Sequence, residues 1–118
     1  MYHLSTCSTC QAIIKELGLR QRGDFEFQDI KTEPITEEQL DGLAQKAGSC
    51  LALFSRRAMK YRELGLHEKP EITQEEAKQY ILKEYTFLKR PVILVGGRLF
   101  VGSEQGQRVA AQEALNGL

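Results

Sequence analysis

Two cysteines separated by two residues, Cys7 and Cys10, lie in the stretch STCSTCQA near the start of the chain. Such a pair can exchange electrons through a disulfide, or it can supply two of the four ligands of a zinc site. The other candidate ligands, Cys50, His3 and His67, form no second pair with zinc-site spacing. The spacing therefore favours a redox-active pair and predicts no metal site, with two unreactive thiols as the remaining alternative.

The sequence around the pair predicts a strand followed by a helix. The run from Tyr2 to Leu4 is short and apolar, as in a strand. An apolar stripe with the spacing of one helix face then begins at Cys10 and continues through Ile13, Ile14 and Leu17. Cys7 falls at or before the first helical turn, where free N–H groups and the helix dipole favour a thiolate. We therefore expect Cys7 to be the exposed nucleophile and Cys10, on the apolar face, to be a shielded resolving thiol.

The remaining patterns predict further strands and helices. The alternation FEFQD at 25–29 is typical of a half-buried strand, and the continuous PVILV at 91–95 is typical of a central, buried one. Gly96-Gly97 suits a hairpin turn back into a strand at 99–101. The helical signals are capping boxes at 36–39 (TEEQ) and 73–76 (TQEE), short helices over 50–65, and a last helix capped by Ser103 and ending at Asn116-Gly117.

This order of elements predicts an α/β fold with a four-stranded mixed sheet covered by helices. The first two strands, joined by a helix, should be parallel, and the terminal hairpin should supply antiparallel strands. Residues 33–88 should form a helical insertion between the second and third strands. We expect one domain over residues 1–118 and a monomer.

Composition limits the function classes. Sixteen basic residues balance sixteen acidic ones, which argues against direct binding of nucleic acid. The chain has neither an apolar run long enough for a membrane span nor a secretory leader pattern, so we expect a cytoplasmic protein. The odd cysteine count argues against a structural disulfide framework. Cys50 should be a partly buried thiol, and His3 and His67 should be solvated.

Arg90-Pro91 is the second notable feature, because proline is unusual at the entrance to a buried strand. It can mark a cis peptide bond, or it can be an ordinary trans proline at the start of a strand.

Taken together, these motifs resemble the ArsC/Spx family, whose members have a thioredoxin fold with a helical insertion. STCSTC resembles the C-x-x-C active site of the Spx branch, with Cys7 as the redox cysteine and Cys10 as the second one. LKRPVIL at 88–94 resembles the family's R-P signature, with Arg90 as its arginine and Pro91 as the cis-proline of the active site.

Two further segments extend the resemblance nearly from end to end. SRRAMKYRELG at 55–65 resembles the segment that carries the family's central arginine, which is assigned to Arg57 with Arg56 as the alternative. FVGSEQ at 100–105 resembles the start of the family's last helix.

Three positions depart from the glutaredoxin-coupled arsenate reductases. Those enzymes usually have C-x-x-S, whereas this chain has Cys10 at the fourth position. Gly102 stands where they carry a third arginine for the oxyanion, and Gln11 replaces a residue that is often basic. All three departures predict weak arsenate reduction.

The resemblance implies a thiol-disulfide oxidoreductase of the arsenate reductase-like class. The Cys7 thiolate would attack an oxidised or oxyanionic substrate, Arg57 and Arg90 would balance the negative charge, and Cys10 would resolve the product as a disulfide. No bound cofactor is implied, but an external thiol reductant is, from the glutathione/glutaredoxin or thioredoxin systems. The substrate would be a small molecule or a protein thiol or disulfide. The alternative is an Spx-like, redox-sensing transcriptional regulator that binds RNA polymerase through its α subunit.

Overall fold

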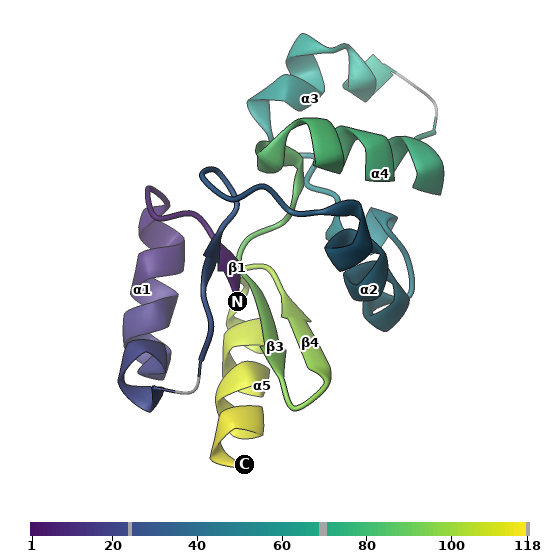
Figure 1. The fold of residues 1–118 in the computed structure, drawn as a ribbon. Coiled ribbons are helices and arrows are strands. Elements are labelled where there is room, and N and C mark those ends of the chain that lie inside the picture. The colour runs from purple at the N-terminus through teal and green to yellow at the C-terminus, as the bar shows by residue number, and fades with distance from the viewer. Residues whose placement is uncertain (24, 69–70, 118) are drawn as a thin grey trace. The chain divides into compact units, whose positions relative to one another are not determined.

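The computed structural model describes residues 1–23, 25–68 and 71–117. Its strands are β1 (Tyr2–His3), β2 (Gln28–Asp29), β3 (Val92–Val95) and β4 (Arg98–Val101) (Figure 1). Its α-helices are α1 (Ser8–Leu17), α2 (Glu37–Ala47), α3 (Met59–Glu63), α4 (Gln74–Lys83) and α5 (Gln105–Asn116). Short 3-10 turns lie at Leu19–Arg22, Leu51–Leu53, Leu66–Glu68 and Tyr85–Phe87. The chain divides into two compact units, one formed by Met1–Glu33 with the chain from Arg90 onward, the other by Pro34–Lys89.

The first unit contains the predicted four-stranded mixed sheet, with strand order β2-β1-β3-β4. β1 and β2 are parallel, while β1 with β3 and β3 with β4 are antiparallel. The hairpin turn is made by Gly96 and Gly97, whose φ angles of 54° and 84° are those that a tight hairpin turn needs and that side chains disfavour. The mixed sheet that the element order predicts is therefore confirmed.

The second strand is shorter than its alternating pattern predicts. The strand register covers Gln28–Asp29, opposite Tyr2 and His3, rather than 25–29, and residue 26 is held through its carbonyl, which accepts from the Met1 amino group at 2.7 Å. β1 begins at residue 2, so no strand lies opposite residues 25–27. Phe25 and Phe27 instead pack against the hydrophobic core.

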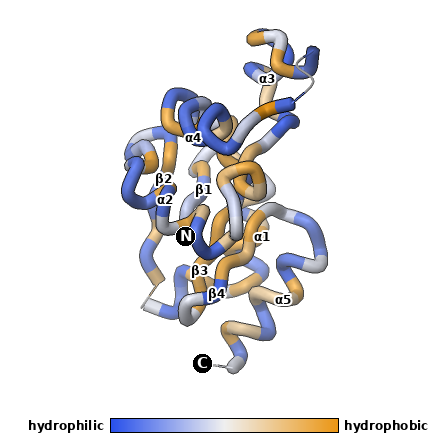
Figure 2. The backbone as a smooth tube through the Cα atoms, turned by 90° about the vertical axis from the view of Figure 1, so that its right-hand side faces the viewer, coloured by the Kyte–Doolittle hydropathy of each residue, from blue (hydrophilic) through white to orange (hydrophobic). Residues whose placement is uncertain are grey.

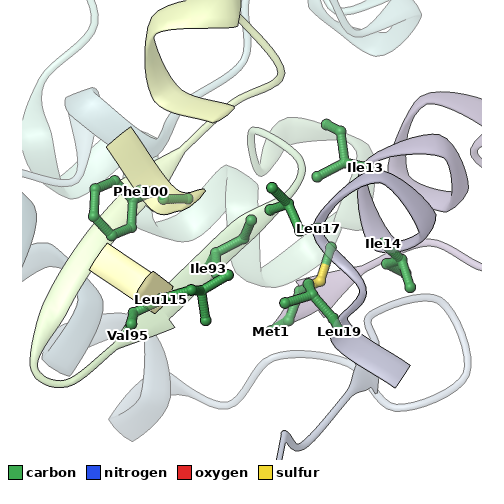
Figure 3. Close-up of a cluster of buried hydrophobic side chains, with 10 residues drawn as sticks. Met1, Ile13, Ile14, Leu17, Leu19, Ile93, Val95, Phe100 and Leu115 are labelled. Carbon is green, nitrogen blue, oxygen red and sulfur yellow. The ribbon is translucent and has the colours of Figure 1, made fainter. Parts of the chain in front are cut away.

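The core of this unit lies between one face of the sheet and the two helices α1 and α5. Ile93 is the register partner of Phe100, so these side chains share a face with Val95, two residues along β3. Figure 2 shows hydrophobic stretches along β3 and β4. Figure 3 shows the buried cluster, which consists of Met1, Ile13, Ile14, Leu17, Leu19, Ile93, Val95, Phe100, Ala111 and Leu115. The predicted apolar face of α1 is thus its buried face, and Gly18 ends the helix in the left-handed conformation, with φ of 64°.

The second unit begins two of its helices with the predicted capping boxes. Thr36 Oγ1 accepts from the Gln39 N–H at 3.1 Å, and Gln39 Oε1 accepts from the Thr36 N–H at 3.0 Å. Thr73 and Glu76 make the same pair of bonds at the start of α4, at 3.1 and 3.2 Å. Each box satisfies two backbone donors that the helix itself leaves free.

Other contacts of the second unit join its helices and turns. Lys78 on α4 pairs with Glu37 at 2.9 Å and Asp41 at 3.1 Å, both on α2. Phe54 stacks on Phe87 with ring centroids 5.2 Å apart. The helical insertion predicted over 33–88 therefore corresponds to a compact unit at Pro34–Lys89.

Two local predictions were wrong. Ser103 does not cap the last helix: the N-cap is Glu104, which makes no side-chain cap bond, and Gln107 Oε1 accepts instead from the Val101 N–H at 3.1 Å. His3 is not solvated, because β1 is an interior strand; the side chain is only 5% exposed and lies edge-to-face with Phe27 at 5.8 Å. Burial lowers the pKa of His3. Across the described ranges, none of the helices has the length and apolar character needed to cross a lipid bilayer.

Candidate functional site

Cys7 is the N-cap residue of α1. Its N–H donates to the Leu4 carbonyl at 3.1 Å, and its own carbonyl accepts from the Gln11 N–H at 3.1 Å as the helix begins. No acidic residue occupies the first turn of α1. The free N–H groups of that turn can therefore interact with the sulfur of Cys7 rather than with a carboxylate.

The surroundings of Cys7 favour its thiolate. Burial by itself would raise its pKa, but several groups together outweigh that effect and the pKa is lowered. In order, they are the N–H and the thiol of Cys10, the positive charge of Arg90 and the N–H of Thr9. Two of these contributions come from helix N–H groups, as the predicted position of Cys7 requires.

The surroundings of Cys10, by contrast, favour the protonated thiol. Its side chain is fully buried on the apolar face of α1. Burial, followed by the hydrogen bond and the negative charge of Cys7, raises the pKa of Cys10 to about 11, against the opposing effects of Leu4 and Arg90. All three cysteines are free thiols in this structure. At neutral pH Cys10 is therefore protonated.

A network of hydrogen bonds holds the loop that precedes the nucleophile. Asp29, at the end of β2, accepts from the Ser5 N–H at 3.3 Å and from the Lys31 N–H at 3.0 Å. Gln11 Nε2 donates to the Leu4 carbonyl at 3.4 Å, the same oxygen that accepts from Cys7. The Ser5 hydroxyl, followed by the two backbone N–H groups, lowers the pKa of Asp29. The loop is thus fixed both from its own helix and from the neighbouring strand.

Sequence reasoning did not identify Asp29, although a signal for it existed. β1 and β2 are parallel, so their carboxyl ends lie at one edge of the sheet. Ser5 follows β1, and Asp29 is the last residue of β2. A polar residue that ends the strand beside β1 was therefore a candidate for contact with the cysteine loop.

Arg90 and Pro91 belong to the same unit as the cysteines. The charge of Arg90 acts on both thiols, and its Nη1 atom is buried without a hydrogen-bond partner. The Arg90–Pro91 peptide bond is cis, one of the two conformations that the sequence left open. Pro91 itself is buried at the start of β3, and its carbonyl accepts from the Gly102 N–H at 2.9 Å.

Comparison with known proteins identifies the family. The model of the ArsC family matches residues 2–110. The chain belongs to the ArsC family. The uncharacterized protein YusI of Bacillus subtilis is 31% identical over 108 residues, which cover 90% of this chain and 91% of YusI.

Solved structures of ArsC-family proteins have the same fold. An arsenate reductase from Vibrio cholerae superposes with a TM-score of 0.74 at 19% identity, covering 92% of each chain. A protein related to arsenate reductase from Brucella melitensis superposes with a TM-score of 0.67 at 26% identity, covering 92% of this chain and 89% of the other. The thioredoxin-like fold that the sequence resemblance implied is therefore confirmed.

The remaining predicted arginine lies in the other unit of this ArsC-family chain. Arg57 is exposed, as is its alternative Arg56, and the Arg57 N–H donates to Ser55 Oγ at 3.3 Å. Their roles at the thiols stay predictions. Gly102 has a φ of 91°, and a Cβ atom there would have nothing within 4 Å.

Cys50 also lies in the second unit. It is 9% exposed, and burial raises the pKa of its thiol, so its environment favours the unreactive protonated form. Among the described residues, no group of three or more histidine, cysteine or acidic side chains is arranged to hold a metal ion.

Proposed function

We propose that this protein is a thiol-disulfide oxidoreductase of the arsenate reductase-like class, with Cys7 as the nucleophile and Cys10 as the resolving thiol. The proposal rests on one observation, that the pKa values of the two thiols are shifted in opposite directions. One has a lowered pKa at a helix N-terminus, and the other is buried with a pKa of about 11. A nucleophile must be a thiolate before it reacts, whereas a resolving thiol should remain protonated until then.

The reaction begins at Cys7. Its thiolate attacks one sulfur of a disulfide substrate, forms a mixed disulfide and releases the other sulfur as a thiolate, which takes up a proton. The charge of Arg90 stabilises the Cys7 thiolate before the attack. A guanidinium group is also suited to a negatively charged group on the substrate.

Cys10 completes the reaction. The negative charge of Cys7 contributes to the raised pKa of Cys10, and that charge disappears when the mixed disulfide forms. Cys10 then loses its proton more readily, attacks the Cys7 sulfur and releases the bound half of the substrate. The two thiols have supplied two electrons, and an external thiol such as glutathione, glutaredoxin or thioredoxin returns them by reducing the Cys7–Cys10 disulfide.

Arg57 completes this proposal as a second positive charge for the thiolate or for an oxyanionic substrate, and Arg56 is the alternative. This role rests on the resemblance of the segment 55–65 to the family. Arginine suits it because the guanidinium group can donate two parallel hydrogen bonds to an oxyanion.

Trapping of mixed disulfides tests the proposal. In a Cys10→Ser variant the mixed disulfide on Cys7 cannot be resolved, so mass spectrometry after exposure to a cell extract should find partners attached to Cys7. Cys50→Ser is the matched control for loss of a buried thiol and should trap no more than the wild type. Equal trapping by Cys7→Ser and Cys10→Ser would refute the assignment of the nucleophile.

The trapped partners and a separate binding measurement on the wild type distinguish the enzyme from an Spx-like regulator. Small thiols, or several unrelated proteins, attached to Cys7 support an oxidoreductase. For a regulator, binding of the RNA polymerase α subunit should instead change when the Cys7–Cys10 disulfide forms, without a mixed disulfide.

A further inference from the structure

The short helix α3 contributes no buried side chain to its unit. Met59, at its start, is 80% exposed, and Leu64, which ends it, is 55% exposed. Large apolar side chains in water add nothing to folding stability, since the hydrophobic effect rewards only the area that is buried. Met59, the more exposed of the two, is therefore accessible to a partner.

Tyr61 is the residue of α3 that packs against aromatic rings of the same unit. The Tyr61 ring lies 6.2 Å from the ring of Phe54 and 6.5 Å from that of His67. Positions 59 and 61 are separated by about 200° around a helix, so Met59 lies on the side opposite this contact. Met59 is thus directed away from the body of the unit by the same geometry that anchors Tyr61.

The segment around α3 also carries an excess of positive charge. It contains Arg56, Arg57, Lys60 and Arg62 but only one acid, Glu63. Glu63 pairs with Lys60 at 3.2 Å. In the part of the chain that the structure describes, the three arginines make no ion pair with any acid and are all exposed. The whole chain is balanced in charge, so this surplus is local.

We propose that Arg56, Met59 and Arg62, called here the α3 surface, bind an acidic protein segment that carries an apolar side chain. Carboxylates on the partner would take the guanidinium groups in charge-assisted bonds. Its apolar side chain would cover Met59, whose flexible thioether adapts to irregular surfaces. Arg57 is left out of this surface because it already has a predicted role at the thiols.

Other anionic partners fit the α3 surface less well. A nucleic acid could bind the arginines through its phosphates, but it would leave Met59 without an apolar partner. An anionic membrane is usually bound by a long amphipathic helix, whereas α3 has five residues. An exposed Met59, beside arginines that make no ion pair with any acid of the described ranges, favours an acidic protein segment.

Fluorescence anisotropy with a labelled peptide of repeated Glu-Glu-Leu tests this proposal on the whole chain. We expect saturable binding that weakens with salt and is at least about tenfold tighter than binding of a poly-glutamate peptide of equal charge. The thiols take no part, so Cys7→Ser should bind like the wild type. Loss of the proposed oxidoreductase function would therefore leave this result unchanged.

Variants locate the binding on the molecule. Met59→Ser should remove most of the preference for the leucine-containing peptide, and Arg56→Glu with Arg62→Glu should weaken binding of both peptides by about tenfold or more. Val109→Ser and Lys31→Glu change an exposed apolar residue and an exposed cation elsewhere, and both should bind normally. All of these side chains are exposed, so far-ultraviolet circular dichroism should stay unchanged.

Three results would overturn the proposal. The first is the absence of saturable binding of the Glu-Glu-Leu peptide. The second is an equal loss of binding in the α3 variants and their controls. The third is tighter binding of a duplex oligonucleotide or of vesicles containing phosphatidylserine than of the peptide.

Discussion

The backbone N–H of Gly102 donates a hydrogen bond of 2.9 Å to the carbonyl of Pro91. This bond ties the loop that precedes α5 to the residue that follows Arg90, close along the chain to the group that acts on both thiols. Gly102 makes the bond with a φ of 91°, a conformation that residues with side chains rarely adopt. The position that the sequence resemblance matches to a third arginine of arsenate reductases is therefore one whose backbone suits glycine.

We predict weak arsenate reduction for this reason. Losing one charged contact to a developing anion typically lowers a rate about a hundredfold or more. Gly102→Arg should not restore activity, because the strained backbone would cost about 1–3 kcal/mol. Arsenate reduction is measured as turnover with glutathione and glutaredoxin. The loss of stability in Gly102→Arg is measured as the midpoint of urea unfolding.

Gly106→Arg is the matched control for that substitution. Gly106 lies within α5 with open space around it and an ordinary backbone, so arginine there should stabilise the helix by up to about 1 kcal/mol. Arsenate turnover equal to that of a glutaredoxin-coupled family reductase would contradict the prediction.

Alkylation of Cys7 by iodoacetamide, followed by peptide and by pH, should reveal its lowered pKa. Its rate should reach half its maximum below the ordinary thiol value of about 8.5, because the thiolate is the reactive form. Arg90→Ala removes a stabilising positive charge, so it should shift this midpoint upward and slow alkylation at neutral pH. Arg98→Ala, which removes an exposed arginine of β4, should leave the midpoint in place.

Cys10 provides an internal comparison in the same experiment. With a pKa of about 11 and a fully buried side chain, it should stay unmodified at neutral pH. A Cys7 that titrates like a free thiol would show that the nucleophile is wrongly assigned. A lowered midpoint that does not respond to Arg90→Ala would leave the helix N-terminus as its cause.

Asp29→Ala should raise the pKa of Cys7 without unfolding the protein. The substitution frees the Ser5 N–H and allows the loop before Cys7 to move away from the N–H groups of α1. Ser5 is exposed, so the loss in unfolding free energy should stay within about 1 kcal/mol. Asp41→Ala, which removes an acid that pairs with Lys78 in the other unit, should leave Cys7 alkylation unchanged.

The pH dependence of this contact follows from the lowered pKa of Asp29. A carboxyl whose pKa is lower in the folded state stabilises the fold above its unfolded value of about 3.9 and loses that contribution as the pH falls through the folded value. The contact should therefore persist at neutral pH and disappear only in acid.

The midpoint of the pH dependence of Cys7 alkylation decides the role of Asp29. A midpoint that is the same in Asp29→Ala and wild type would show that the loop is held by Gln11 and Leu4 alone.

Removal of the helix caps should destabilise the second unit. Thr36→Ala and Thr73→Ala each break a capping box and should cost about 1 kcal/mol of unfolding free energy, measured by urea denaturation. Ser103→Ala is the control, because Ser103 precedes α5 without capping it, and should change stability by no more than about 0.5 kcal/mol. A cost for Ser103→Ala equal to that of the two threonine variants would show that it caps the helix after all.

Local patterns in the sequence were sufficient for most of the helices. The buried stripe of α1, the left-handed Gly18 that ends it and both capping boxes all depend on residues within a few positions of one another. The same locality made Cys7 predictable as a helix N-cap. The difference between Cys7 and Cys10 followed from the periodicity of a single helix.

Tertiary structure decided what depends on distant segments. β2 is short because β1, its parallel partner, begins only at Tyr2, and His3 is buried because strands lie on both sides of β1. Asp29 and Ser5 are 24 residues apart, and nothing local to either one predicts their contact. Arg90 acts on the thiols only because antiparallel pairing of β1 with β3 brings the start of β3 to the strand that precedes the cysteines. The sequence by itself determined which residues can react, because that depends on residue type and helical period. The groups that shift the pKa values of those residues were decided by the pairing of strands that lie far apart in the chain.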